Sequence, residues 1–158
     1  LAESLSRIYD GKFVPLHAPA RVSSRNIRDE LLKEDSLLPA IYLTQKLDIA
    51  VVGIGYPNEK SAIMATGYFK ENEIESLIDR KVAGELCMQF YDIYGDTAPY
   101  KDDNNVIGMD ISMLRSVPRS IGIAGGIEKL RAVRGAINGH YINTLITDIE
   151  CAEALISE

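Results

Sequence analysis

The sequence contains no Trp, two Cys and two His among its 158 residues, and it has no long apolar run. A helix that spans a bilayer needs about 20 consecutive apolar residues, so no membrane segment is expected. The first residues also lack the basic-then-apolar pattern of a secretion signal. The chain begins without Met and directly inside an apparent helix, which predicts a fragment of a longer protein whose N-terminal part is missing.

Cysteine and histidine are too few and too scattered for a zinc site or a disulfide framework. Cys87 and Cys151 lie in apolar surroundings without CxxC spacing, so both are expected to be buried free thiols in a reducing cytoplasm. The two histidines lie in a loop and a turn, with no nucleophile or ligand set in recognisable context. The sequence therefore predicts no metal, no cofactor and no catalytic residue.

The charge balance is acidic, with a formal net charge of −6 and a pI near 5.0. Binding to a nucleic-acid backbone needs a concentrated basic face, so this chain is not expected to bind nucleic acid by itself. A local basic pocket for one small anion remains compatible with that charge. The hydrophobic fraction of 46% and charged fraction of 25% indicate one ordinary compact domain.

Hydrophobic periodicity predicts alternating helices and strands. The run "DIAVVGIG" is almost wholly apolar and rich in β-branched residues, which is typical of a strand buried on both faces in a parallel sheet. The last third reads β-α-β-α, so an α/β domain with helices covering both faces is expected. Helices are expected over 1–9, 25–34, 37–47, 70–81, 111–117, 127–138 and 148–158. Strands are expected over 12–18, 48–55, 84–93, 104–110, 119–126 and 141–147. An irregular connection is expected over 56–69.

The segment "AGGIEK" is the first candidate for chemistry, because it joins a strand to a helix through Gly125 and Gly126 and places Lys129 one turn further on. Ligands of open α/β sheets bind beyond the carboxyl ends of the strands, and free N–H groups at a helix start favour an anion. A tight turn followed by a solvated lysine is the structural alternative. The spacing is neither a Walker A loop nor a GxGxxG fingerprint.

Two further candidates lie at strand ends. Gly53 and Gly55 close the apolar strand and could bring backbone amides to a ligand, or simply let the chain turn away. Glu85, at the start of a strand, could bind sugar hydroxyls or act as a base, or be an ordinary exposed glutamate. Thr147 or Asp148 is expected to cap the last helix.

The motifs in order identify a known family. "LHAP", "VGIG", "GELCMQFYDIYG", "VIG", "VPR", "AGGIEK" and "YINTLITD" follow one another over residues 16–155. In this combination the chain resembles the effector-binding domain of SorC-type bacterial transcriptional regulators, also called the sugar-binding domain. The resemblance implies a three-layer α/β/α sandwich with a mostly parallel sheet, like that of glucosamine-6-phosphate deaminase and ribose-5-phosphate isomerase.

The resemblance also implies a function and a site. Residues 1–158 would form a sugar-phosphate-binding domain that lacks its first part, and a helix-turn-helix outside this chain would bind operator DNA in a homodimer or homotetramer. Lys129 matches the lysine that contacts phosphate, and Gly125 and Gly126 match the turn beside it. Gly53 and Gly55 match the family's glycine loop near the ligand.

Two departures from the family pattern bear on the ligand. Glu85 replaces the usual aspartate, and Met88-Gln89 replaces the usual Gly-Arg. A lost arginine would remove a bidentate anion contact if it pointed inward. The leading hypothesis remains a cytoplasmic, non-catalytic sensor of a phosphorylated sugar. The alternatives are a sugar-phosphate isomerase or deaminase of the same fold, and a dimerisation module with a degenerate pocket.

Overall fold

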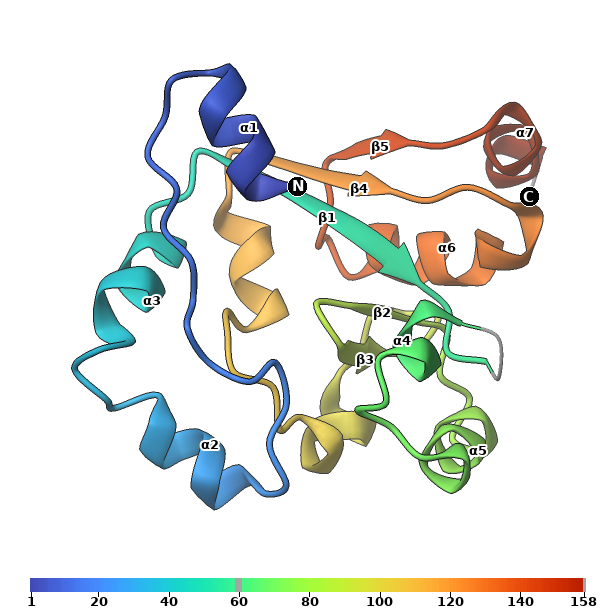
Figure 1. The fold of residues 1–158 in the computed structure, drawn as a ribbon. Helices are drawn as coiled ribbons and strands as arrows, with labels where there is room; N and C mark the ends of the chain where they lie inside the picture. The colour runs from blue at the N-terminus through green and yellow to red at the C-terminus, as the bar shows by residue number, and fades with distance from the viewer. Residues whose placement is uncertain (59–60, 158) are drawn as a thin grey trace.

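A five-stranded sheet in the order β3-β2-β1-β4-β5 forms the centre of the computed structural model, which describes residues 1–58 and 61–157 (Figure 1). The strands are β1 (Ile49–Gly55), β2 (Gly84–Leu86), β3 (Gln89–Tyr91), β4 (Arg119–Ile123) and β5 (Thr144–Ile146). β4 pairs in parallel with both β1 and β5, whereas β2 pairs antiparallel with β1 and β3. Four of the five described strands therefore run in the same direction and β2 runs opposite to them. The predicted α/β fold with a mostly parallel sheet is confirmed.

The helices follow the predicted order but are shorter. The α-helices are α1 (Ala2–Ile8), α2 (Arg25–Leu31), α3 (Leu38–Thr44), α4 (Ala62–Ala65), α5 (Glu71–Asp79), α6 (Leu130–Asn138) and α7 (Ile149–Ser157). The 3-10 helices are η1 (Ala98–Asp103), η2 (Ile111–Ser116) and η3 (Ile127–Lys129). α4 lies within the stretch predicted as irregular. Glu59 and Lys60 of that stretch, and Glu158 at the predicted end of the last helix, lie outside the described residues.

Local sequence signals explain where two of these helices begin. The Ser24 hydroxyl accepts a hydrogen bond from the Ile27 backbone N–H at 3.3 Å, so Ser24 is the N-cap of α2. At α5 the Glu73 carboxylate accepts from the Lys70 backbone N–H at 2.9 Å, and Ile74 and Leu77 point into the core. Capping and apolar spacing thus act together at α5.

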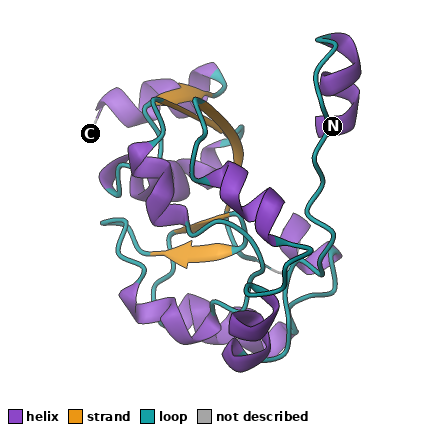
Figure 2. Cartoon of the chain, turned by 90° about the vertical axis from the view of Figure 1, so that its left-hand side faces the viewer, coloured by secondary structure: helices purple, strands orange, loops and turns teal. Residues whose placement is uncertain are grey.

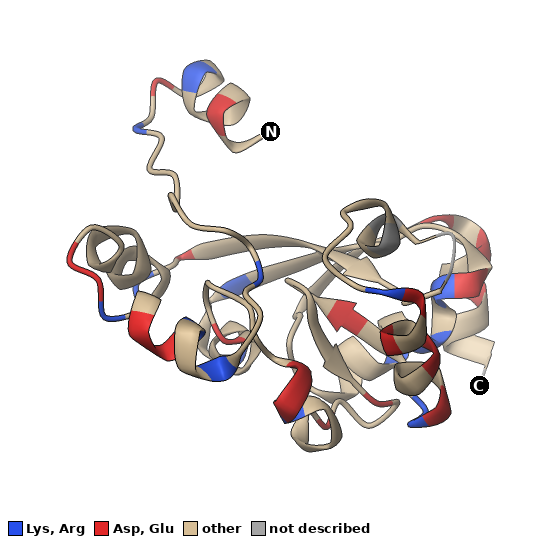
Figure 3. Ribbon diagram, turned by 60° about the horizontal axis from the view of Figure 1, so that its bottom comes forward, with Lys and Arg blue, Asp and Glu red and all other residues tan. Residues whose placement is uncertain are grey.

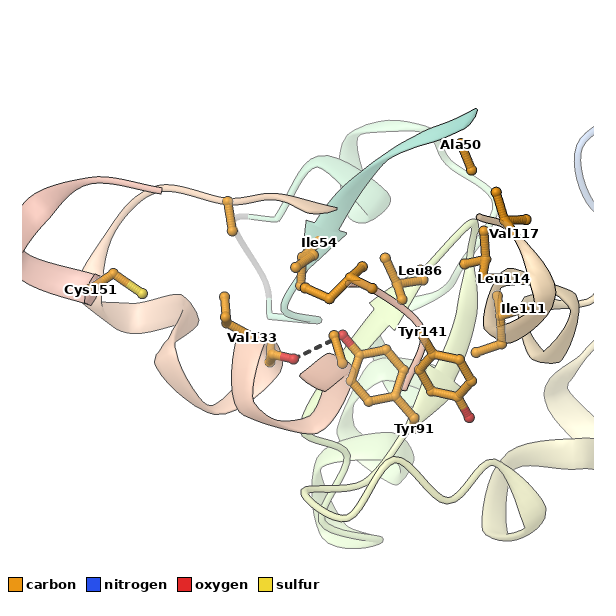
Figure 4. Packing of buried hydrophobic residues seen from close by; sticks show 14 residues of the cluster. Ala50, Ile54, Leu86, Tyr91, Ile111, Leu114, Val117, Val133, Tyr141 and Cys151 are labelled. Atoms are coloured by element: carbon orange, nitrogen blue, oxygen red, sulfur yellow. Dashed lines mark hydrogen bonds between the residues drawn. The ribbon is translucent and has the colours of Figure 1, made fainter. Parts of the chain in front are cut away.

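The main core lies between the sheet and α6 (Figure 4). Ile54 of β1 and Leu86 of β2 pack with Val133 of α6, and all three are buried. The Tyr91 hydroxyl donates to the Ala132 carbonyl at 3.0 Å, which joins β3 to α6 inside the core. A smaller cluster gathers under α5: Ile63, Phe69, Ile74, Leu77, Val82, Phe90 and Tyr100.

The opposite face of β1, β4 and β5 is apolar and exposed. Ile49 and Val51 of β1 are 55% and 57% exposed, and Ile123 of β4 and Ile146 of β5 are 44% and 54% exposed. The sequence predicted that β1 is buried on both faces, and the described chain buries only one. Within that chain, α6 covers the buried face and no described helix covers Ile49 and Val51.

The N-terminal segment stands apart from the domain. α1 buries no residue, and an extended stretch connects it to the rest of the chain (Figures 2 and 3). The strand predicted over 12–18 is wrong, because this stretch has no strand beside it in the part of the chain that the structure describes, and a strand is stable only when paired. The strand predicted over 104–110 is also wrong and is reduced to a single bridge between Arg21 and Val106. No described helix is long and apolar enough to cross a membrane.

Candidate functional site

The carboxyl ends of β1 and β4 lie side by side and bring the predicted site residues to one edge of the sheet. Gly53 is the register partner of Ile123, and the Gly125–Gly126 turn follows two residues later. Gly55 is the register partner of Glu85 on the other side of β1. The loops that leave β1 and β4 therefore meet β2 at this edge, where parallel sheets bind ligands.

Glu85 lies across Gly55. If Gly55 carried a Cβ, that atom would overlap the Glu85 carboxylate and lie 2.8 Å from its Cδ. Gly53 has open space at the same point, with no atom within 4 Å of a Cβ built there. Gly55 is thus required by a close approach, whereas Gly53 borders an open area.

The hairpin between β2 and β3 fixes the Glu85 carboxylate. Its Oε2 accepts a hydrogen bond from the Met88 backbone N–H at 2.8 Å. Cys87 and Met88 have φ of 52° and 62°, the left-handed pair of a two-residue hairpin turn. The continuous strand predicted over 84–93 is therefore wrong, because the chain reverses at these two residues. Cys87 is exposed at this turn, contrary to prediction, while Cys151 is buried as predicted.

Burial is the main influence on Glu85 and raises the pKa of its carboxyl above the ordinary value. The Met88 N–H and the positive charge of Lys129 act in the opposite direction. The Lys129 charge thus favours the ionised form of the Glu85 carboxyl. Lys129 is half-buried at the start of α6, shortly after the turn that leaves β4, and Glu85 pairs with the end of β1, so the two residues come from elements that meet at the same edge of the sheet.

The Gly125–Gly126 turn is hydrogen-bonded to the side chain of Asp148. Gly126 has φ of 100°, which strongly favours glycine, and its N–H donates to Asp148 Oδ2 at 2.5 Å. Asp148 Oδ1 accepts from the Cys151 N–H at 2.9 Å, so the predicted cap of the last helix is confirmed. These backbone N–H groups, Cys151 first, lower the pKa of the Asp148 carboxyl.

The contact between Asp148 and Gly126 is a feature that the sequence reasoning missed. Asp148 follows β5 and Gly126 follows β4, and these strands are parallel neighbours. Because the ends of parallel neighbours meet at one edge, that adjacency was the available signal. The Gly126 N–H, predicted as a possible donor to an anion, is occupied by this internal carboxylate.

Gln89, at the position of the expected arginine, points away from Glu85. Its register partner is Leu86, and residues 86 and 89 lie on the face of the hairpin opposite to that of Glu85. Its Nε2 donates to the Met109 carbonyl at 2.8 Å, and its Oε1 accepts from the Ile111 N–H at 3.3 Å. Gln89 thus holds the segment before η2 and is not directed at the candidate site.

A cavity of about 170 Å³ lies elsewhere, between α2, η1 and η2. Arg28, at its rim, donates to the Asn104 carbonyl at 2.8 Å and pairs with Asp29. The lining contains none of the six predicted site residues: it consists of Arg25, Arg28, Gln89, Phe90, Thr97, Tyr100, Lys101, Asn104, Asp110 and Ile111. Among the described residues, no group of three His, Cys, Asp or Glu side chains could hold a metal ion.

Comparison with known proteins decides the family. Residues 1–157 match the family model of a sugar-binding domain. The chain belongs to this sugar-binding domain family. It is 33% identical to the sorbitol operon regulator of Klebsiella pneumoniae over 138 residues, 87% of the chain and 44% of the regulator. It is 36% identical over 142 residues to the transcriptional regulator LsrR of Escherichia coli, covering 88% of the chain and 45% of LsrR.

Solved structures agree with this assignment of the sugar-binding domain. The full-length sorbitol operon regulator SorC from Klebsiella pneumoniae superposes with a TM-score of 0.87 at 29% identity, over 98% of this chain and 50% of SorC. A DeoR family regulator from Listeria monocytogenes gives 0.90 at 25% identity, over 97% and 62% of the two chains. The chain spans about half the length of the curated relatives it matches.

The resemblance to SorC-type regulators predicted from the motifs is thereby confirmed. The relatives are named as transcriptional regulators, which also confirms the prediction that the chain is not an enzyme.

Proposed function

We propose that this sugar-binding domain senses a phosphorylated sugar and thereby controls operator binding by a helix-turn-helix outside this chain. Lys129 would contact the phosphate as a point charge, and the Glu85 carboxylate would accept hydrogen bonds from sugar hydroxyls. The domain would act in the cytoplasm, without a cofactor, in a homodimer or homotetramer. The effector would work by binding one quaternary state more tightly than the other.

The single observation that carries this proposal is the strand register, which brings Glu85 and the turn that leads to Lys129 to the same carboxyl edge of the parallel strands. A sugar phosphate presents hydroxyl donors at one end and a dianion at the other, which matches a carboxylate beside an ammonium group. Gly53 leaves open space over the sheet near this edge, since a Cβ built on it would meet no atom within 4 Å. The names of the relatives add support, since one regulates a sorbitol operon and another is a deoxyribonucleoside regulator.

A thermal-shift screen of the full-length protein tests the proposal. The panel contains sorbitol, 2-deoxyribose, ribose and fructose, each beside its terminally phosphorylated form and beside inorganic phosphate. A ligand that binds only the folded state stabilises it, by about 2.7 kcal/mol at a concentration of 100 Kd. At least one phosphorylated sugar should raise Tm more than its parent sugar and more than inorganic phosphate.

The screen also separates the alternatives. If no sugar or sugar phosphate raises Tm, the sensing function is contradicted and a dimerisation module with a degenerate pocket is favoured. If a sugar phosphate is converted on incubation, the isomerase or deaminase alternative replaces the sensor.

A further inference from the structure

Gly126 is hydrogen-bonded through both of its backbone polar groups. Its N–H donates to Asp148 Oδ2 at 2.5 Å, and its carbonyl accepts from the Lys129 N–H at 3.0 Å. A short chain of hydrogen bonds therefore runs from Asp148, through Gly126, to the backbone of Lys129. Asp148 is 22 residues from Gly126 in sequence but adjacent to it at this edge, because it follows the neighbouring strand β5.

Asp148 is itself held in place. Its second oxygen, Oδ1, accepts from the N–H of Cys151, whose side chain is fully buried in the main core. The same two backbone N–H groups lower the pKa of the Asp148 carboxyl, so it stays ionised at neutral pH. Asp148 thus connects the glycine turn to the start of α7, which the core fixes.

The glycine turn needs such an outside constraint. Gly126 has φ of 100° and ψ of 135°, and glycine has many accessible backbone conformations of similar energy. Gly125 is exposed, and a Cβ built on it would be 3.3 Å from Asp148 Oδ2, so the carboxylate lies against both glycines. Without Asp148, little else among the described contacts would hold the Gly126 N–H.

We propose that Asp148 is a positioning residue for Lys129: by holding Gly126, it fixes where the lysine leaves the backbone and so where its ammonium group meets a ligand phosphate. This inference rests on the proposed function, in which Lys129 contacts phosphate. Asp148 does not contact the ligand in this role. Asp148 also carries a charge and caps α7, and suitable substitutions can distinguish these two properties from its bond to Gly126.

The experiment compares Asp148→Ser and Asp148→Asn with the wild type in the full-length protein. Serine is a good helix N-cap but has no second oxygen to reach Gly126. Asparagine removes the charge and keeps one acceptor oxygen of the same reach. Titration calorimetry would use the phosphorylated sugar that binds tightest in the panel above, together with its unphosphorylated parent.

Asp148→Ser should raise the Kd of the phosphorylated sugar about tenfold, which corresponds to about 1.4 kcal/mol, because the backbone of Lys129 would no longer be held in place beneath the phosphate. The Kd of the unphosphorylated sugar should stay the same, because Lys129 is expected to meet only the phosphate. Asp148→Asn should recover part of the lost affinity. Asp110→Ser is the matched control, since Asp110 caps η2, the helix that precedes β4, through a bond from the Ser112 N–H at 2.8 Å and has no contact with the Gly125–Gly126 turn.

A double-mutant cycle with Lys129→Ala decides whether Asp148 acts through the lysine. In the Lys129→Ala background, Asp148→Ser should cause no further loss of affinity for the phosphorylated sugar. An equal loss in both backgrounds, unchanged binding in Asp148→Ser, or tighter binding because a repelling charge is gone, would each overturn the inference while the proposed function stands. If the wild type binds no sugar phosphate, the proposed function falls and this role falls with it.

Discussion

Glu85 occupies the space next to Gly55 that any larger residue at position 55 would need. The two residues are register partners on β2 and β1, and a Cβ on Gly55 would lie 2.8 Å from Glu85 Cδ and 3.1 Å from Cγ. The overlap therefore involves the buried stem of the side chain as well as its tip. The glycine at 55 and the carboxylate at 85 each determine what the other position can hold.

Gly55→Ala should destabilise the domain by about 1–3 kcal/mol, the usual cost of overpacking a well-packed position. The new methyl group would push Glu85 off the Met88 N–H and away from Lys129. Gly53→Ala is the matched control on the same strand, because a Cβ at Gly53 meets no atom within 4 Å. Urea denaturation of the three proteins measures the difference.

Glu85→Ala should rescue Gly55→Ala, because it removes the side chain that the methyl group meets. The double variant is expected to be more stable than the sum of the two single effects predicts. Simple additivity would show that the overlap is relieved by a backbone shift and that the pair is not coupled.

Glu85→Gln should stabilise the domain at neutral pH. Burial raises the pKa of the Glu85 carboxyl, so the folded state binds its proton more tightly than the unfolded state does. Stability therefore falls as pH rises from the ordinary value of 4.5 through the folded pKa, and the cost is complete above it. The gain from Glu85→Gln should vanish below pH 4.5. Glu34→Gln, at an exposed position, serves as the control, and a gain of equal size at every pH would contradict this account.

Met88→Gly should stabilise the hairpin turn relative to Met88→Ala. Met88 has φ of 62°, where a residue with a Cβ costs roughly 1–2 kcal/mol and glycine does not. Both variants lose the same packing of the methionine side chain against the hydrophobic cluster under α5, so their difference isolates the cost of the backbone conformation. Thermal unfolding should give the glycine variant the higher Tm by several degrees. Equal Tm values would mean that the left-handed conformation costs nothing here.

Much of the sheet could be predicted from the sequence because its strands carry strong local signals. The apolar run that ends at Gly55 forms a strand and the segment after Pro118 folds β-α-β-α, both as predicted, although the described chain buries only one face of β1. The gathering of Gly53, Gly55 and Lys129 at one edge follows from that topology, because parallel strands end on the same side. The roles of these residues toward a ligand stay predictions.

The features that could not be predicted depend on non-local pairing or unusual backbone geometry. The two turn residues are Cys87 and Met88, whereas glycine or asparagine would be expected at such a turn, so the sequence predicts one continuous strand here. The stretch over 12–18 is predicted as a short strand but has no pairing partner among the described residues. The contact between Asp148 and Gly126 joins two loops that are distant in sequence.

Titration calorimetry of Lys129→Ala tests the central claim most directly. The full-length wild type, Lys129→Ala and the control Lys101→Ala would be titrated with a phosphorylated sugar and its parent; Lys101 is exposed and lines the cavity between α2, η1 and η2. Losing a charged contact should raise the Kd of the phosphorylated sugar about tenfold to a hundredfold in Lys129→Ala alone, with the parent sugar unaffected. Unchanged binding in Lys129→Ala would contradict the account. A loss confined to Lys101→Ala would also contradict it and would place the phosphate in the cavity that Lys101 lines.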